Sequence, residues 1–125
     1  MRSLGKSLAF GIFSLLSVAA VQASPRIVLV AGGSEDAVNI SAKSAKLKEP
    51  FGTDFDAAGN MWIIEMVSGN RLLKVDDSGV LSHVAGLAQP GFLGDGGPAL
   101  VAKFNGPHNF AVLPKGNILI ADTWN

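Results

Sequence analysis

The sequence predicts an all-β fold, a partial β-propeller of about two four-stranded antiparallel blades with short helical turns in the loops between blades. Three observations predict this fold. One segment recurs at a constant offset of 57 residues, its apolar runs are separated by residues typical of tight turns, and those runs do not alternate with polar residues. A fixed period of this size is typical of folds in which each repeat covers the apolar faces of its neighbours.

The repeat is clearest between residues 42–65 and residues 99–122. Without any gap, seven of these 24 positions are identical, whereas chance gives about one or two. We expect a first copy at about 42–86 and a second copy at 99–125, within a propeller region that covers 24–125. The identical pairs are Ala42 and Ala99, Ala45 and Ala102, Lys46 and Lys103, Pro50 and Pro107, Gly59 and Gly116, Asn60 and Asn117, and Ile63 and Ile120.

The first 23 residues have the pattern of a secretory signal peptide. Arg2 and Lys6 are followed by an apolar segment from Leu8 to Val21, and the small residues Val21 and Ala23 frame a cleavage site. A membrane-anchoring helix is the alternative, but the apolar segment is shorter than the roughly 18 to 20 residues that a spanning helix needs. We therefore expect cleavage near Ala23, a secreted or periplasmic protein, and no stable membrane span after cleavage.

The remaining composition excludes several functional classes. After cleavage the chain has eight basic and ten acidic residues and no cysteine. A nucleic-acid or anionic-membrane surface needs clustered Lys and Arg, which this chain lacks. Without cysteine it has neither disulfides nor thiol chemistry, so packing must stabilise the fold.

The first apolar run after the signal, residues 26–31, is predicted to be a strand. It is rich in β-branched residues and ends at Gly32 and Gly33. Residues 80–85 form a similar run, and both runs end in Val-Ala-Gly. We therefore expect 26–31 to be an outermost strand that precedes the first copy.

In each copy, a loop with glycines and a short helical segment precedes the shared hairpin. Residues 91–98 are Gly-rich, but they match neither a phosphate-binding loop nor a calcium loop, since Asp95 alone offers a side-chain oxygen. The glycines are better explained by a tight connection. Residues 41–46 and 98–103 are predicted to be single helical turns, with Pro98 at the first helical position.

The shared core of each copy reads as an antiparallel hairpin. Residues 50–56 and 107–113 are predicted strands that begin with proline, which cannot donate to a ladder. Turns rich in Asp, Gly and Asn then lead back to 61–64 and 118–121. Because these return strands are apolar without alternation, we expect both of their faces to be buried.

The first copy continues with two further strands at 71–75 and 80–85, joined by a turn at 76–79. Four antiparallel strands with both faces covered by neighbouring sheets are typical of a propeller blade. We expect the aromatic residues of these strands to lie in the core between blades. They are Phe51, Phe55, Trp62 and Phe110.

These segments resemble the NHL repeat of secreted bacterial proteins, and the resemblance covers residues 27–125. It implies a six-bladed β-propeller, and the chain has one full copy, a half copy and a leading strand, as an N-terminal fragment would. A fragment of this kind has open sheet edges, so we expect it to self-associate. The segments that carry the resemblance are Pro50-x-Gly52, Asp56-x-x-Gly59-Asn60, Glu65, Asn70-Arg71-Leu72, Gly94–Ala99, Pro107, Gly116-Asn117 and Ala121–Asn125.

His108 is the most informative polar side chain, because it begins a predicted innermost strand and would face the mouth of a central channel. Similarity to secreted lyases built on this repeat, which hold a metal with His at a Pro-His position, makes it a weak metal candidate. One histidine is not a site, since zinc catalysis uses about three protein ligands. The candidate channel-mouth or ligand-binding residues are His108, Asn109, Phe51 and Asp54.

Similarity to gluconolactonase-type propellers implies that Glu, Asn and Asp near the channel hold a divalent cation such as Ca²⁺ or Zn²⁺. Glu65 and Asp122 are the weak metal candidates of this kind, beside Asp54 and Asn125. At the acidic position of the repeat, however, the carboxylate normally binds backbone N–H groups of a neighbouring turn, and we expect that structural role. His83 is expected in an outer strand with a solvated ring.

Two functional hypotheses follow. The first is a non-catalytic binding or interaction scaffold without a cofactor, whose partner is a protein, a small molecule or a carbohydrate rather than nucleic acid. The second is a metal-dependent lactonase or lyase whose other ligands lie in further blades. We favour the first, since no Ser-His-Asp arrangement or other convergent catalytic set is recognisable, and the fold itself does not decide function.

Overall fold

The computed structural model describes residues 24–125, so the predicted signal peptide lies outside the described residues. The described part is all-β, as predicted, and its only helical element is one short 3-10 turn. The elements are β1 (Ile40–Ser41), β2 (Pro50–Phe55), β3 (Met61–Glu65), β4 (Arg71–Val75), β5 (Val80–Ala85), η1 (Ala99–Val101), β6 (Pro107–Val112) and β7 (Ile118–Asp122).

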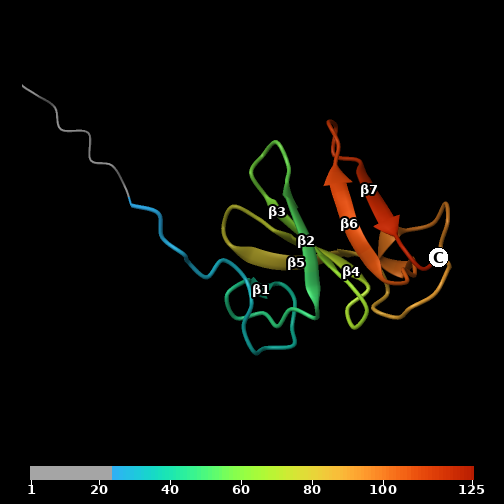
Figure 1. The fold of residues 1–125 in the computed structure, drawn as a ribbon, viewed down its shortest axis with the longest axis horizontal. Helices are drawn as coiled ribbons and strands as arrows, with labels where there is room; N and C mark the ends of the chain where they lie inside the picture. Colours follow the sequence, from blue (N-terminus) through green and yellow to red (C-terminus); the bar gives the residue numbers. More distant parts are fainter. Residues whose placement is uncertain (1–23) are drawn as a thin grey trace, which may run out of the picture.

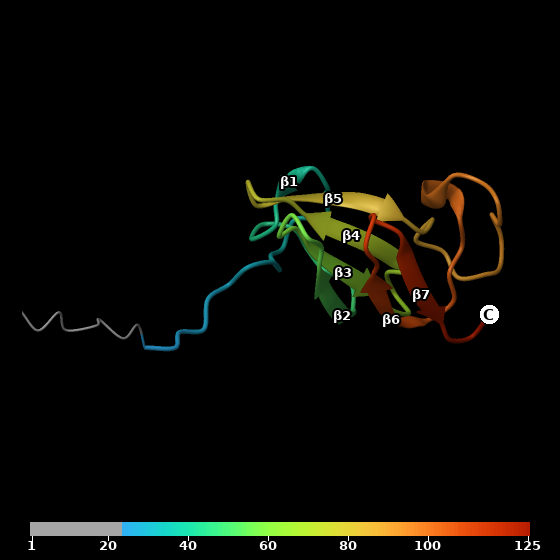
Figure 2. The same cartoon turned by 90° about the horizontal axis from the view of Figure 1, so that it is seen from above.

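Two antiparallel sheets make up the fold. Five strands form the first sheet in the order β1-β5-β4-β3-β2, and β6 and β7 form the second. The second sheet lies against one face of the first, with β6 packed on β2 and β3 (Figures 1 and 2). This arrangement is that of a partial β-propeller, and the described residues form no closed ring.

Asp side chains build the two hairpin turns of the first sheet. The Oδ1 atom of Asp56 accepts the backbone N–H groups of Ala58 and Asn60 at 3.0 and 2.9 Å. Asp76 accepts those of Ser78 and Val80 at 3.0 Å each in the same way. Such Asx turns replace the missing ladder bonds at a chain reversal, which explains why each strand returns antiparallel at the predicted place.

The first sheet has an apolar core on each of its faces. Ile63, Leu73, Val75 and Leu81 are buried on one face, and Ile64, Leu72 and Ala85 on the other. Since successive residues of a strand point to opposite faces, the adjacent Ile63 and Ile64 belong to different cores. The lack of alternation in 61–64 therefore predicted burial on both faces correctly.

Different parts of the chain cover the two faces. The second sheet covers one of them through Phe110, which is buried, and through Ile118 and Ile120. The segment around Ala42 and Ala45 covers the other. Only one face of β7 is covered by described residues, because Leu119 is 62% exposed, so the prediction of two buried faces does not hold for this strand.

The loops that lead into the two copies have the same backbone geometry. Gly32 donates its N–H to Ala42 O at 2.9 Å, and Gly86 donates to Ala99 O at 3.0 Å. In the next positions, Gly33 donates to Ala45 O and Leu87 to Ala102 O, both at 2.7 Å. The sequence repeat is therefore also a repeat of backbone hydrogen bonds.

Two predicted elements differ in the structure. Residues 26–31 form no strand, and Ile40–Ser41 pairs with the outer edge of β5 instead. Residues 41–46 form a hydrogen-bonded turn rather than a helix, in which Ala45 donates to Ser41 O at 3.1 Å. The second predicted helical turn is the short η1 that follows Pro98.

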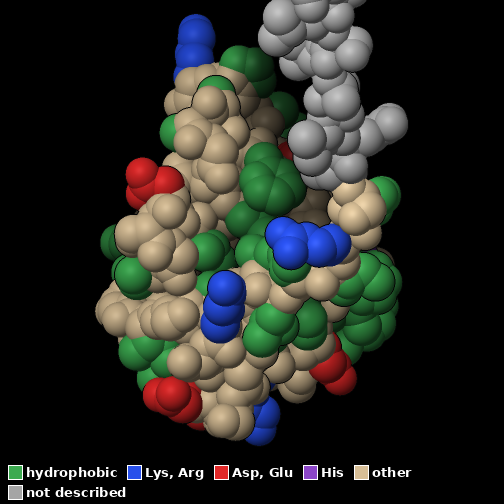
Figure 3. Space-filling view, turned by 90° about the vertical axis from the view of Figure 1, so that its left-hand side faces the viewer, with side chains coloured by type: hydrophobic (Ala, Val, Ile, Leu, Met, Phe, Trp, Pro, Cys, Tyr) green, Lys and Arg blue, Asp and Glu red, His purple; other side chains and the backbone are tan. Residues whose placement is uncertain are grey.

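Several hydrophobic side chains are exposed, which corrects part of the core prediction. Phe110 is buried and Trp62 is half-buried, but Phe51 and Phe55 are 62% and 61% exposed. Figure 3, which views the left-hand side of Figure 1, shows hydrophobic side chains that lie between separate charged ones. In the described part of the chain, no helix is long and apolar enough to cross a membrane.

Candidate functional site

A β-bulge occurs at the start of the first hairpin strand in both copies, β2 and β6. The register between β2 and β3 shifts between Pro50 and Gly52, and that between β6 and β7 shifts between Pro107 and Asn109. The extra residue is therefore Phe51 in one strand and His108 in the other. A bulge bends its strand and re-aims the side chain of the extra residue, so both copies direct this position away from the regular ladder.

The two bulge residues meet, and a third ring joins them. The ring centres of Phe51 and His108 are 5.0 Å apart with the planes at 82°. His108 and Trp124 have centres 5.6 Å apart at 85°. Such edge-to-face pairs are the favoured geometry for aromatic rings. We call Phe51, His108 and Trp124 the aromatic cluster.

Backbone and side-chain contacts select the tautomer of the neutral His108 ring. Its Nδ1 atom lies 2.9 Å from Gly106 O and 2.8 Å from the hydroxyl oxygen of Thr123. A carbonyl oxygen can only accept, so Nδ1 carries the proton that is donated to Gly106. In the neutral ring the lone pair is then on Nε2, which makes no hydrogen bond to the described residues and can accept one from a ligand.

Gly106 determines the position of Trp124. The Gly106 backbone has a φ of +64°, and a Cβ atom there would lie 2.3 Å from the Trp124 ring. Only a residue without a side chain allows both this backbone conformation and this close approach. The indole ring lies on the Gly106 backbone and is 53% exposed.

Asp54 and Asn109 bind the backbone and do not join the aromatic cluster. Asp54 Oδ2 accepts the backbone N–H of Val112 at 2.9 Å, which links β2 to β6, and Oδ1 accepts that of Phe55 at 2.8 Å. The hydrogen bonds from Val112 and Phe55 lower the pKa of Asp54 below its ordinary value. Asn109 Oδ1 accepts the N–H of Phe110 at 2.8 Å.

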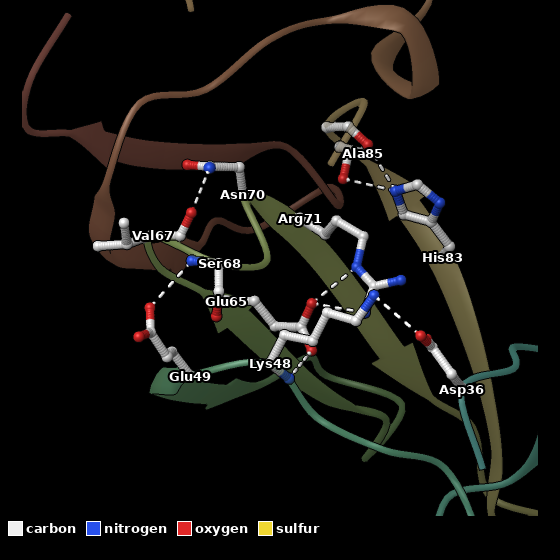
Figure 4. Close-up of polar contacts among 11 residues, drawn as sticks. Asp36, Lys48, Glu49, Glu65, Val67, Ser68, Asn70, Arg71, His83 and Ala85 are labelled. Carbon is white, nitrogen blue, oxygen red and sulfur yellow. Dashed lines mark hydrogen bonds and ion pairs between the residues drawn. The ribbon is translucent and has the colours of Figure 1, made fainter. Parts of the chain in front are cut away.

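Glu65 takes part in a buried ion pair (Figure 4). Its Oε2 atom lies 2.7 Å from both Nε and Nη2 of Arg71. Its Oε1 atom accepts the backbone N–H of Lys48 at 2.6 Å. Glu65 is fully buried and Arg71 is 9% exposed, so the charged carboxylate has a partner for each oxygen, as a buried charge requires.

Asp122, the repeat equivalent of Glu65, also binds a backbone N–H group of the loop that precedes its hairpin. Its Oδ1 atom accepts the backbone N–H of Asn105 at 2.7 Å, and Asn105 is the repeat equivalent of Lys48. The predicted binding of backbone N–H groups by the carboxylates at this repeat position is therefore confirmed in both copies.

The structure does not bring the candidate metal ligands together. No group of three or more His, Asp or Glu side chains that could hold a metal is found within residues 24–125. Glu65 is occupied by Arg71 and by the Lys48 backbone, and His108 lies among aromatic rings. The described residues therefore offer a metal only isolated ligands.

His83 is not solvated as predicted. Its Nε2 atom lies 2.6 Å from Gly86 O and 3.1 Å from Ala85 O, and the residue is half-buried. Because both neighbours are carbonyl oxygens, the Nε2 proton is donated to the chain that leaves β5. His83 therefore holds this connection in place.

Trp124 and Thr123 belong to the site but were not among the residues predicted from the sequence. The antiparallel register pairs Pro107 with Asp122, so the residues that follow Asp122 must lie beside those that precede Pro107. The predicted hairpin was therefore a signal that could have placed Trp124 beside Asn105 and Gly106, just before β6. The position of the Trp124 ring also depends on its close approach to Gly106. A glycine in the sequence does not by itself predict that approach.

A mainly apolar hollow lies at the end of the strands opposite the aromatic cluster. It has a volume of about 520 Å³ and lies between the β2–β3 turn and the β6–β7 turn, with Phe55, Val112 and Pro114 in its lining. Asp56 and Lys115 are its charged residues. Asp56 already binds Asn60 and Trp62 through its second oxygen, at 2.8 and 3.1 Å.

Comparison with known proteins supports the fold. No protein-family model and no curated protein matches the chain. A structural genomics protein of unknown function from Bacteroides thetaiotaomicron VPI-5482 has a similar structure, with a TM-score of 0.63 and 28% identity. The similarity covers 74% of this chain and 24% of that one, so the chain spans about a quarter of the length of the protein it matches.

Proposed function

We propose that the protein is an exported, non-catalytic binding module of the NHL-repeat, six-bladed propeller type, and that the aromatic cluster is its ligand-binding surface. The observation that carries this proposal is the free Nε2 acceptor of His108 between two exposed rings. Aromatic surfaces with a few oriented polar groups are typical of ligand sites. The repeat pattern in the sequence and the two stacked sheets support the propeller type.

The chemistry of the cluster favours a ligand with an apolar ring face and a hydroxyl donor. The faces of aromatic rings carry partial negative charge and attract the weakly positive C–H groups of such a ligand. The His108 Nε2 lone pair can accept a hydrogen bond from one ligand hydroxyl, because the Nδ1 proton is donated to Gly106 O and Nδ1 also contacts Thr123. A neutral carbohydrate combines both features, so we propose a carbohydrate ligand.

A metal-dependent lactonase or lyase is the second candidate. One observation favours it: a histidine whose Nδ1 donates to a carbonyl oxygen has the orientation of a metal ligand that binds through Nε2. The further ligands would have to come from other blades. Stoichiometric, tightly held Zn²⁺ or Ca²⁺ in the purified protein, with loss on His108→Ala, would favour this candidate.

The carbohydrate proposal is tested by NMR titration with maltotriose, cellotriose and xylotriose, followed at the indole N–H groups of Trp62 and Trp124 and at the His108 ring. We expect at least one sugar to shift the Trp124 and His108 signals with a dissociation constant in the millimolar range or below. Trp62 is the internal control, because its N–H is already bound to Asp56 at 3.1 Å.

Two variants decide whether the shifts report the aromatic cluster. Trp124→Ala and His108→Ala should each weaken binding about tenfold or more, whereas Phe55→Ala removes an exposed ring outside the cluster and should leave the dissociation constant unchanged. The proposal fails if no sugar shifts these signals at about 10 mM, or if Trp124→Ala binds as the unchanged protein does.

A further inference from the structure

Asn105 and Gly106 form an Asn-Gly pair, and no other asparagine in the sequence precedes a glycine. In such a pair the backbone nitrogen of the glycine attacks the side-chain amide carbon of the asparagine, because glycine has no side chain to obstruct the approach. The new C–N bond closes a succinimide ring, and the amide nitrogen leaves as ammonia. Water then opens the ring at either of its carbonyl carbons and gives aspartate or isoaspartate. Asn105 therefore has the sequence context of a deamidation site.

In the folded protein, the nitrogen that would attack is bonded and buried. Gly106 donates its N–H to Asn70 Oδ1 at 3.0 Å, and this hydrogen bond is buried. Asn70 is itself held in place, because its Nδ2 atom donates to Val67 O at 2.7 Å (Figure 4). The Gly106 nitrogen attacks only after a base removes its proton, and a buried, bonded amide proton reaches a base in solution only when the structure opens locally. The Asn70 contact therefore opposes the reaction.

The group that would leave is also engaged. Asn105 Nδ2 donates to Trp124 O at 3.0 Å, and this bond must break before the nitrogen departs as ammonia. The backbone N–H of Asn105 donates to Asp122 Oδ1 at 2.7 Å. Contacts on both sides of the Asn105–Gly106 peptide bond thus hold the pair in its unreacted form.

We propose that Asn105 is a modification site whose deamidation is controlled by the contact between Asn70 and Gly106, and that the modification releases Trp124. While the β3–β4 turn stays on the start of β6, the Gly106 nitrogen is unreactive. Local separation of the two sheets at this point frees the N–H, and Asn105 then converts to aspartate or isoaspartate. The site thereby records how often the two sheets have separated.

The product would disturb the region around Trp124. A carboxylate at position 105 has no proton to donate to Trp124 O, and it adds a second negative charge beside Asp122, which binds the backbone of the same residue. Isoaspartate also adds a methylene group to the backbone next to Gly106, where even a Cβ atom would lie 2.3 Å from the Trp124 ring. This effect concerns the position of Trp124 and does not depend on what the aromatic cluster binds.

The first test measures the deamidation rate of the purified protein in mildly alkaline buffer, with and without enough urea to unfold it. Mass spectrometry of the proteolytic fragment that contains residues 105 and 106 follows the reaction, because exchange of the amide for an acid raises the mass. We expect the folded protein to react at least about tenfold more slowly than the unfolded protein. Equal rates would overturn the proposal.

Two variants separate local opening from global unfolding. Asn70→Ala should raise the rate in the folded state about tenfold, because it removes the acceptor of the Gly106 N–H. Val75→Ala is the control, since it weakens the core on the face of the first sheet away from the second sheet and leaves this contact intact. Both are compared at urea concentrations that give them the same free energy of unfolding. A rate for Val75→Ala equal to that for Asn70→Ala would contradict control by this contact.

Asn105→Asp reproduces one of the products. We expect it to shift the indole N–H signal of Trp124 and the ring signals of His108 in NMR spectra. Asn109→Asp is the matched control, because it adds the same charge nearby but keeps an oxygen for the Phe110 N–H, and it should leave both signals in place. The same signals are followed in the aged, deamidated protein, so the readout does not depend on the folding of a variant. Unchanged Trp124 signals in both modified forms would refute the release of Trp124.

Discussion

The side-chain oxygen of Asn70 accepts the backbone N–H of Gly106 at 3.0 Å, which joins the β3–β4 turn of the first sheet to the start of β6 in the second. Asn70 is 2% exposed, and its side-chain nitrogen donates to Val67 O at 2.7 Å. One amide therefore satisfies two backbone groups from different sheets. Its own backbone has a φ of +47°, a conformation that asparagine tolerates better than most residues.

We predict that Asn70→Ala lowers the free energy of unfolding by about 1 to 3 kcal/mol, because it leaves a buried N–H without a partner. Urea denaturation measures this loss. Asn117→Ala, at an exposed turn position, is the control and should change stability by less than about 0.5 kcal/mol. Equal effects of the two substitutions would mean that the contact between the sheets contributes nothing.

Loss of the Glu65–Arg71 ion pair is predicted to lower the free energy of unfolding far more than loss of the Lys48–Asp36 ion pair. Arg71→Ala leaves a buried carboxylate without its counter-charge and should destabilise the protein by about 3 to 5 kcal/mol. The Lys48 and Asp36 side chains are 3.2 Å apart and 31% and 62% exposed. Lys48→Ala should therefore cost about 1 kcal/mol or less. Urea midpoints of similar size for both variants would contradict this ranking.

Gly106→Ala is predicted to displace Trp124 from the aromatic cluster. The added methyl group cannot fit beside the indole ring, so the near-ultraviolet circular dichroism of Trp124 and the His108 ring signals should change. Gly116→Ala is the matched control, because its φ is also positive at +82° but its Cβ would meet open space. Backbone strain alone costs about 1 to 2 kcal/mol there; an unchanged His108 signal in Gly106→Ala would refute the clash.

Stability is predicted to fall in acid through Asp56. Hydrogen bonds from the side chains of Asn60 and Trp62 and from backbone N–H groups lower the pKa of Asp56 to about 2. A carboxylate with a lowered pKa stabilises the folded state above its unfolded value of 3.8, and this contribution disappears as the pH falls toward 2. Urea midpoints for Asp56→Asn should therefore vary less between pH 5 and pH 2 than those of the unchanged protein. The same slope in both proteins would rule out this origin.

The sequence by itself determined the hairpins of this protein. The runs 71–75 and 80–85 are strands with the predicted limits, and Asp56 and Asp76 reverse the chain where predicted. These signals are local, since an Asx turn and a β-branched run act on residues only a few positions apart. Residues 61–64 are apolar without alternation, and this pattern also predicted correctly that both faces of β3 are covered.

Only the tertiary structure decided which distant residues meet. The aromatic cluster combines residues from β2, from β6 and from beyond β7, and no local pattern encodes the close approach of Trp124 to Gly106. Residues 26–31 have the pattern of a strand but form none, because a strand needs a neighbour whose position lies outside its own sequence. Phe51 and Phe55 likewise have core character yet remain exposed, since burial depends on which sheet lies opposite.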